Sequence, residues 1–322
     1  MKRIIIQASS HNAACNLAGE AELIESPYSH ILYLWENDPC VVIGRYQNPF
    51  DECDLKAMER DEVLLVRRNS GGGAVYHDRG NICFTIIRDR EPRQQLKENF
   101  DFVIQVLGTL GIEATLSGRN DILVQGKKVS GNAFQYTKDR FCHHGTLLVG
   151  SNLSIMSRYL TPNKEKLESH AVKSVGSRVG NLKEFQPDIT NEKVMEAFVQ
   201  AFRKRYGATP LETVDYEKKE STKTLAQHFS DKAILLKKTP PFSWKGSHRF
   251  SWGSVTVGLS VKEGAIMEAD IATDCLDTSL VPEWEAMIKG KMFDGGSFHE
   301  EKETAETSDL CRYLADALPK RS

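Results

Sequence analysis

Long apolar segments are missing from this sequence. No apolar run approaches the roughly 18 residues that a membrane-spanning helix requires. The first residues, MKRIIIQASSHNAAC, contain only a three-residue apolar run after Lys2 and Arg3, too short for the apolar region of a signal peptide. We therefore expect a cytoplasmic protein that has no membrane partner.

An excess of charge of one sign is also missing. The 42 Lys and Arg residues against 44 Asp and Glu residues give a net charge of −2, so no overall basic field favours nucleic acid. The 7 cysteines include no C-x-x-C pair, which argues against both a disulfide framework and a structural zinc site. Any partner must therefore be selected by local features, and we expect no nucleic-acid partner.

The composition that is present is that of an ordinary globular chain. It has 322 residues, of which 40% are apolar and 27% charged, and this length favours about two domains. Helical patterns at residues 16–24, 94–110 and after Thr190 are interspersed with strand patterns in an irregular order. This order predicts an α/β or α+β fold built on a mixed sheet.

A polar stretch with two prolines, TPPFSWKGSHRF at residues 239–250, predicts a domain boundary. We expect one domain over residues 1–240 and a smaller one over residues 250–322. In the second, SVTVGLSV alternates apolar and small polar residues and is followed by a Lys-Glu-Gly turn, which predicts a hairpin. The charged residues 215–238 fit either a linker or an edge helix.

Three consecutive glycines in RRNSGGGAVYH, residues 67–77, are the first candidate site. Backbone without Cβ atoms lets N–H groups converge on an anion, although a plain tight turn has the same composition. The planar guanidinium groups of Arg67 and Arg68, with their paired N–H donors, fit phosphate or carboxylate. No P-loop motif occurs, and a strand rather than a helix follows, which excludes the dinucleotide fingerprint.

A second candidate site lies in SGRNDILVQGKKVSGNAF, residues 117–134. Asp121 fits a Mg²⁺ ligand, because Mg²⁺ prefers one or two carboxylates plus phosphate oxygens, but an Asn-Asp pair is also a common turn. Lys127 and Lys128 are adjacent, so only one of them can face a site if the segment is extended. In HHGTLLVG, residues 143–150, the two histidines face opposite sides of a strand, which makes a shared metal improbable and favours structural or positioning roles.

These motifs together resemble the lipoate–protein ligases of the biotin/lipoate ligase superfamily. The likeness rests on RRNSGGGAVYHDRGNICFT, SGRNDILVQGKKVSGNAF, HHGTLLV and SVGSRVGNL, and it extends through KTPPFSW and RFSWG. It implies a catalytic domain related to class II aminoacyl-tRNA synthetase cores and a small C-terminal domain that moves during the cycle. It also implies ATP, Mg²⁺ and lipoate, and as acceptors the lipoyl domains of 2-oxoacid dehydrogenase E2 subunits and the glycine cleavage H protein.

The resemblance also assigns site residues. It implies a nucleotide site made by Arg68, Gly73, Ala74, Val75 and Tyr76. It implies that Lys128 contacts both lipoate and the α-phosphate, and that Asp121 holds the metal. The residues implied for the lipoyl pocket are Ser70, Gly72, His77, Ser130, Gly131, Ala133 and Thr146. One departure is Gly176, where relatives often carry a larger polar residue.

The implied reaction activates lipoate as lipoyl-AMP, releases pyrophosphate and transfers the lipoyl group to a lysine. The general base of the transfer stays open between Asp121 and a phosphate oxygen. One alternative is a lipoyl or octanoyl transferase that uses a prebuilt adenylate or a thioester, for which Cys142 beside His143 is the available thiol–imidazole pair. A biotin ligase and a binding module without catalysis are weaker alternatives.

Overall fold

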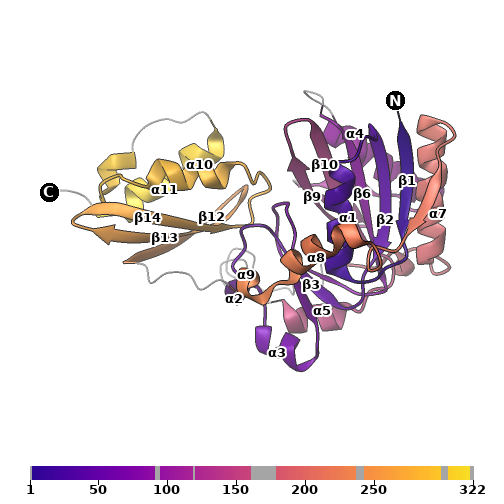
Figure 1. Ribbon diagram of the computed structural model, residues 1–322, viewed down its shortest axis with the longest axis horizontal. Coiled ribbons are helices and arrows are strands. Elements are labelled where there is room, and N and C mark those ends of the chain that lie inside the picture. Colours follow the sequence, from indigo (N-terminus) through magenta and orange to yellow (C-terminus); the bar gives the residue numbers. More distant parts are fainter. Residues whose placement is uncertain are drawn as a thin grey trace.

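An eight-stranded mixed sheet forms the centre of the larger part of the chain, in the order β11-β1-β2-β6-β10-β9-β8-β7 (Figure 1). The computed structural model describes residues 2–90, 95–118, 120–160, 179–236, 243–298 and 304–319. The strands are β1 (Arg3–Ala8), β2 (His30–Glu36), β6 (Asn81–Asp89), β7 (Thr115–Ser117), β8 (Asp121–Val124), β9 (Lys127–Tyr136), β10 (Arg140–Leu148) and β11 (Leu211–Val214). β1 pairs in parallel with β2 and β11, and the remaining neighbours are antiparallel. The predicted mixed α/β fold is confirmed.

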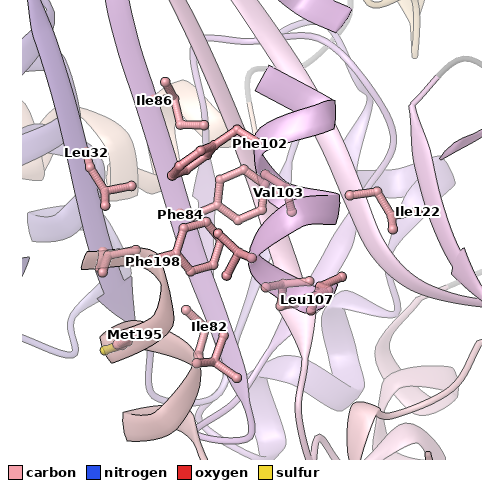
Figure 2. Close-up of a cluster of buried hydrophobic side chains, with 14 of the residues drawn as sticks. Leu32, Ile82, Phe84, Ile86, Phe102, Val103, Leu107, Ile122, Met195 and Phe198 are labelled. Carbon is pink, nitrogen blue, oxygen red and sulfur yellow. The ribbon is translucent and has the colours of Figure 1, made fainter. Parts of the chain in front are cut away.

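The alternation of side chains along β2 explains why both faces of this sheet are covered. Leu32 and Leu34 point to one face, and Tyr33 and Trp35 to the other, and all four are buried. On the first face, α4 (Gln95–Thr109) and α7 (Asn191–Tyr206) pack against the sheet. Figure 2 shows this core, in which Phe84 stacks on Phe198 with ring centroids 5.3 Å apart.

The ends of these two helices follow the predicted signals. The Thr190 side chain accepts a hydrogen bond from the Lys193 amide, as expected for an N-cap, and Glu192 lies in the first turn. Gly111, just after α4, has φ = 76°, a left-handed conformation that glycine adopts without strain. The predicted helix boundaries are therefore confirmed to within a few residues.

The opposite face of the sheet is covered by α1 (Ala13–Ile24) and α8 (Lys223–Ser230). Asn12 caps α1, and its side chain accepts from the amides of Ala14 and Cys15. Helix α8 packs on α1 and follows a short 3-10 helix, Glu220–Thr222. The segment 215–238, which fitted either a linker or an edge helix, thus contains a helix that buries Ala226 and Phe229 in the core.

A small sheet of order β4-β3-β5 carries the glycine-rich loop. Its strands are β3 (Cys40–Ile43), β4 (Leu64–Arg67) and β5 (Val75–His77), so the glycines connect β4 to β5, as their sequence context predicted. Around this sheet lie α2 (Pro49–Glu52), α3 (Leu55–Arg60), α5 (Leu153–Tyr159) and α9 (Lys232–Leu235). A 3-10 helix, Leu182–Glu184, precedes α7.

The C-terminal part of the chain has its own sheet, β12-β13-β14, and its own core (Figure 1). Strands β12 (Trp244–Phe250), β13 (Gly253–Lys262) and β14 (Ala265–Thr273) pack under α10 (Leu280–Ile288) and α11 (Ala305–Ala317), with a 3-10 helix at Gly295–Phe298. The predicted hairpin is confirmed, and its turn uses Glu263 and Gly264, both with positive φ. We call residues 244–319 the small unit.

Within the described ranges, two apolar side chains pack against the hydrophobic core of the other part. Tyr46 of the larger part packs against the core of the small unit, and Leu276 of the small unit packs against the main core. Among the described residues, no helix is both long and apolar enough to span a membrane.

A chain that ends at Pro240 is expected to fold and stay soluble, because its cores lose little more than the packing of Leu276. It is expected to be impaired in the complete reaction cycle. Circular dichroism and a thermal melt compared with the full chain check the first expectation, and a lipoylation assay checks the second. An insoluble product would show that the boundary near residue 240 is wrong.

Candidate active site

A cavity of about 420 Å³ lies between the small sheet, α1 and strands β2, β6, β9 and β10. Of the site residues proposed from the sequence, all except Ser70 and Ser130 line it. Those that do are Arg68, Gly72, Gly73, Ala74, Val75, Tyr76, His77, Asp121, Lys128, Gly131, Ala133 and Thr146. Segments far apart in the sequence therefore line one cavity.

The close approach that the glycines permit involves the small unit. A Cβ atom on Gly71 would lie 2.0 Å from the carbonyl oxygen of Cys275, which excludes any side chain there. Gly72 has φ = 88° and donates its amide N–H to the same Cys275 carbonyl at 3.3 Å. Gly73 has no atom within 4 Å of its Cβ position and opens onto the cavity.

Arg68 is buried and contacts the glycine loop that follows it in the sequence. Its Nη2 donates to the carbonyls of Gly71 at 2.6 Å and Gly73 at 2.9 Å, its Nη1 donates to Val42 at 3.1 Å, and its Nε donates to the Ser70 hydroxyl at 3.1 Å. Burial lowers the pKa of the guanidinium to about 10, so it is still charged at neutral pH. The guanidinium N–H groups that were expected to bind phosphate are thus largely occupied by hydrogen bonds to carbonyls of the loop itself.

Arg67 points away from this cavity. Its guanidinium donates to the carbonyls of Gly44, Arg45, Gln47 and Leu235, which joins the β3–α2 loop to α9. Of the two adjacent arginines, Arg68 alone lines the cavity.

Lys128 and Asp121 face each other across strands β8 and β9. The ammonium lies 2.8 Å from the carboxylate, and each side chain is about a third exposed (37% and 35%). Lys127 instead pairs with Glu184 at 2.6 Å, outside the cavity. The predicted opposite orientation of the two lysines is confirmed.

A β-bulge decides which lysine faces the cavity. Ile122 pairs with Ser130, but Leu123 pairs with Lys128, so Val129 is an extra residue without a partner in β8. The bulge places Lys128 on the same face as Gly131, whose Cβ position lies 3.4 Å from the lysine ammonium.

The residues after the bulge form a polar wall of the cavity. The Gly131 amide donates to the Thr146 hydroxyl at 3.2 Å, and Ala133 continues the same face. Ser130 is fully buried on the opposite face, where its hydroxyl accepts from Asn132 at 3.1 Å. The hydroxyl of Ser130 therefore supports the strand from behind.

His77 lines the cavity and is held by a hydrogen bond to its Nδ1. Asn37 Oδ1 accepts from Asn16, so Asn37 Nδ2 is the atom that donates to His77 Nδ1 at 2.9 Å, and the ring proton lies on Nε2. Nε2 is buried and has no hydrogen-bond partner among the residues that the structure describes. Burial, and then the charge of Arg68, lowers the pKa of His77 from 6.5 to about 3, so the ring is neutral.

His143 and His144 face opposite sides of β10, as predicted. His143 Nε2 contacts Asn132 Oδ1 at 2.9 Å, and its ring packs on Phe100 with centroids 4.9 Å apart. His144 instead contacts Glu20 and Ser70 on the cavity side. The neighbouring Cys142 is buried, and burial raises the pKa of its thiol well above the ordinary value.

Sequence reasoning missed two groups of residues that line the cavity. Leu17, Trp35, Val42 and Cys83 form its apolar wall, and their apolar periodicity indicated only that they belong to the core. Arg249, Asp274 and Leu276 come from the small unit, and no local pattern indicates that they approach the glycine loop. The Gly176 segment lies outside the described residues.

Acid is expected to destabilise the fold through two buried histidines. Burial lowers the pKa of His143 to about 3, as it does for His77. The unfolded chain therefore binds more protons below the ordinary pKa of 6.5, and the free energy of unfolding falls as pH falls from 6.5 towards 3.

His143→Phe is expected to remove one of these contributions. The slope of unfolding free energy against pH, measured by urea titration between about pH 6 and pH 5, should become shallower by about 1 kcal/mol per pH unit. An unchanged slope would mean that His143 is not neutral in the folded protein.

Comparison with known proteins identifies the family. Residues 12–203 match the model of the lipoyl protein ligase A/B catalytic domain, and residues 239–313 match that of the bacterial lipoate protein ligase C-terminus. The lipoate-protein ligase A of Psychrobacter cryohalolentis is 42% identical over 292 residues, which cover 87% of this chain and 86% of that protein.

Solved structures agree. LipL1 of P. falciparum in complex with lipoate has a TM-score of 0.85 at 29% identity, covering 98% of this chain and 99% of that one. A lipoate-protein ligase A bound with ATP has a TM-score of 0.61 at 25% identity, covering 73% and 99%. The bipartite ligase of T. acidophilum, studied with its E2 lipoyl domain, has a TM-score of 0.63 at 25% identity, covering 76% and 100%. The chain that contains the cavity described above therefore belongs to the lipoyl protein ligase A/B family.

Proposed function

We propose that this protein activates lipoate with ATP to lipoyl-AMP and transfers the lipoyl group to a lysine of an acceptor protein. The observation that carries the proposal is a single cavity that combines a cation–carboxylate pair, a glycine-rich loop and an apolar recess. An acyl adenylate needs these three surroundings for its phosphate, its nucleotide and its acyl chain.

The apolar recess suits the lipoyl chain. Leu17, Trp35, Val42 and Cys83 supply hydrophobic walls, and the neutral His77 offers its unpaired Nε2–H as the polar contact. A buried donor without a partner costs free energy, and a ligand that accepts from it removes that cost. This arrangement supports the assignment of His77 to lipoate recognition.

The polar side of the cavity suits the activation step. A carboxylate that attacks the α-phosphate brings two anions together, so positive groups must neutralise the charge that develops. Lys128 is the ammonium that lines the cavity beside Gly131, and each such contact contributes about 3 kcal/mol to lowering the barrier. Pyrophosphate leaves, and the mixed anhydride retains the energy needed to form an amide.

The donor set also fits Mg²⁺. Asp121 lines the cavity, and one protein carboxylate together with phosphate oxygens is the coordination that Mg²⁺ prefers. When bound, Mg²⁺ would neutralise phosphate charge. Asp121 would hold it through its carboxylate, which also lies 2.8 Å from the Lys128 ammonium.

We assign lipoyl domains as the acceptors, in particular those of 2-oxoacid dehydrogenase E2 subunits and the H protein of glycine cleavage, in the cytoplasm. The related T. acidophilum ligase supports this assignment because it was studied with its E2 lipoyl domain. The neutral fraction of the acceptor lysine attacks the anhydride, with Asp121 or a phosphate oxygen as the candidate proton acceptor.

Lipoate-dependent exchange of labelled pyrophosphate into ATP tests this function. Exchange requires reversible formation of lipoyl-AMP by the purified protein, and we expect it with lipoate but not without it. A transferase that cannot activate free lipoate gives no exchange yet still modifies an acceptor when lipoyl-AMP is supplied. Cys142 does not support a thioester route, because its thiol is buried and outside the cavity lining.

A further inference from the structure

A carboxylate is buried beneath the glycine loop. Glu20 lies on α1 and is only 4% exposed, and no Lys or Arg among the residues that the structure describes forms an ion pair with it. Its oxygens contact Nδ1 of His144 at 2.9 Å, and Oε2 accepts from the Thr85 hydroxyl at 2.6 Å. A buried charge is retained only where such contacts offset its loss of hydration.

The hydrogen bonds around His144 have a fixed direction. The carboxylate can only accept, so His144 Nδ1 donates to Glu20, and in the neutral imidazole Nε2 accepts from the Ser70 hydroxyl at 2.6 Å. The Ser70 oxygen in turn accepts from Arg68 Nε. A continuous chain thus runs from Glu20 to the guanidinium that holds the glycine-loop carbonyls.

Electrostatic attraction couples Glu20 and Arg68, which are the two ends of this chain of hydrogen bonds. Burial by itself raises the pKa of Glu20, but the hydrogen bonds of His144 and Thr85 and the charge of Arg68 hold it below its ordinary value. Burial lowers the pKa of Arg68, and Glu20 opposes that effect. The carboxylate and the guanidinium therefore keep each other ionised.

A second branch reaches the apolar wall. The Thr85 hydroxyl, which donates to Glu20, accepts from Trp35 Nε1 at 3.3 Å. Trp35 lines the cavity, as do Arg68 and His144. One carboxylate is thus connected to both the loop and the recess.

We propose that Glu20 is a positioning residue for lipoate activation, which fixes the glycine loop through His144, Ser70 and Arg68 and fixes Trp35 through Thr85. This inference rests on the proposed function, since it assigns these two walls to the adenylate and the lipoyl chain. Glu20 itself is not placed in contact with the substrate.

Glu20→Gln tests the proposal, and Glu22→Gln is the matched control. Glu22 lies on the same helix but pairs with Lys219 and Ser221 at the surface. In the lipoate-dependent pyrophosphate exchange, we expect Glu20→Gln to lower kcat/KM by about tenfold to a hundredfold, the range seen when a supporting hydrogen-bond partner is lost. The Glu22 variant should stay within about twofold of the parent.

A double-mutant cycle with Ser70→Ala separates positioning from general destabilisation. If Glu20 acts through the chain, Glu20→Gln should cost less than about threefold once Ser70→Ala has already broken it. Melting temperatures of all the variants are measured alongside. Additive losses in the cycle, or a Glu20→Gln protein as active as the parent, would overturn the proposal.

One measurement does not depend on a variant that folds. The ¹⁵N shifts of His144 in the full-length parent protein should report a proton on Nδ1 and none on Nε2, whereas a proton on Nε2 contradicts the chain. Failure of the proposed function is distinct from these outcomes, because it would appear as no lipoate-dependent exchange in the parent protein.

Discussion

Lys128→Met is expected to slow the formation of lipoyl-AMP by about a hundredfold or more while leaving the melting temperature nearly unchanged. Its ammonium lines the cavity beside Gly131, where it would contact the charge that develops on the α-phosphate. Loss of such a contact costs about 3 kcal/mol in the transition state, and 1.4 kcal/mol corresponds to roughly tenfold in rate. Single-turnover formation of the adenylate measures this step directly.

Lys127→Met is the matched control for that experiment. Lys127 pairs with Glu184 at a partly exposed position, so its removal should change the rate and the stability by less than about 0.5 kcal/mol. If both variants lost activity equally, or only the Lys127 variant did, the assignment of Lys128 would be wrong.

Gly72→Val is expected to abolish detectable adenylate formation with the fold largely retained. The residue has φ = 88°, which a β-branched side chain adopts only with strain, and its Cβ would lie 3.0 Å from Arg68 Nη2 and 3.5 Å from Leu276. The loop must therefore shift, and the guanidinium that holds it moves as well. Pyrophosphate exchange and a thermal melt provide the two readouts.

The same substitution at Gly108 controls for the change of residue type. Gly108 lies in α4 with no atom within 4 Å of its Cβ position and with φ outside the positive range. Gly108→Val should leave both readouts nearly unchanged, because valine is slightly better than glycine in a helix. Normal pyrophosphate exchange by the Gly72→Val protein would mean that the glycine loop is a simple turn.

Local patterns predicted the elements of this fold well. The apolar stripe of Val194, Phe198 and Phe202 predicted α7. The alternation of apolar and small polar residues along 255–261 predicted β13. These predictions succeed because a helix or a strand with one buried face shows its period directly in the sequence. The order of the strands in the sheet joins distant segments, and no local period encodes it.

The position of the lysine shows where alternation alone fails. In a regular strand, residues an even number of positions apart share a face. Lys127 lies four positions before Gly131, so a regular strand would place Lys127 on the same face as Gly131. The bulge at Val129 shifts this count by one, so Lys128 shares the face instead. The family motif selected Lys128, the lysine that lines the cavity, whereas periodicity without knowledge of the bulge would have selected Lys127.

The chain of Glu20, His144 and Ser70 could not be read from the sequence for a different reason. Its members are 124 and 74 positions apart along the chain, and each alone resembles an ordinary core or turn residue. Only the packing of α1 onto the sheet brings the carboxylate under the loop. Polar networks of this kind depend on tertiary contacts that leave no local signature.

The hydrogen bond between the Gly72 amide and the Cys275 carbonyl has a thermodynamic consequence. One N–H group serves one strong acceptor at a time, so an anion that binds this amide must displace the small unit from it. For such an anion, the docked carbonyl would be a competitor carried within the chain. If K is the equilibrium constant for docking, the apparent dissociation constant of such an anion is multiplied by the factor 1 + K.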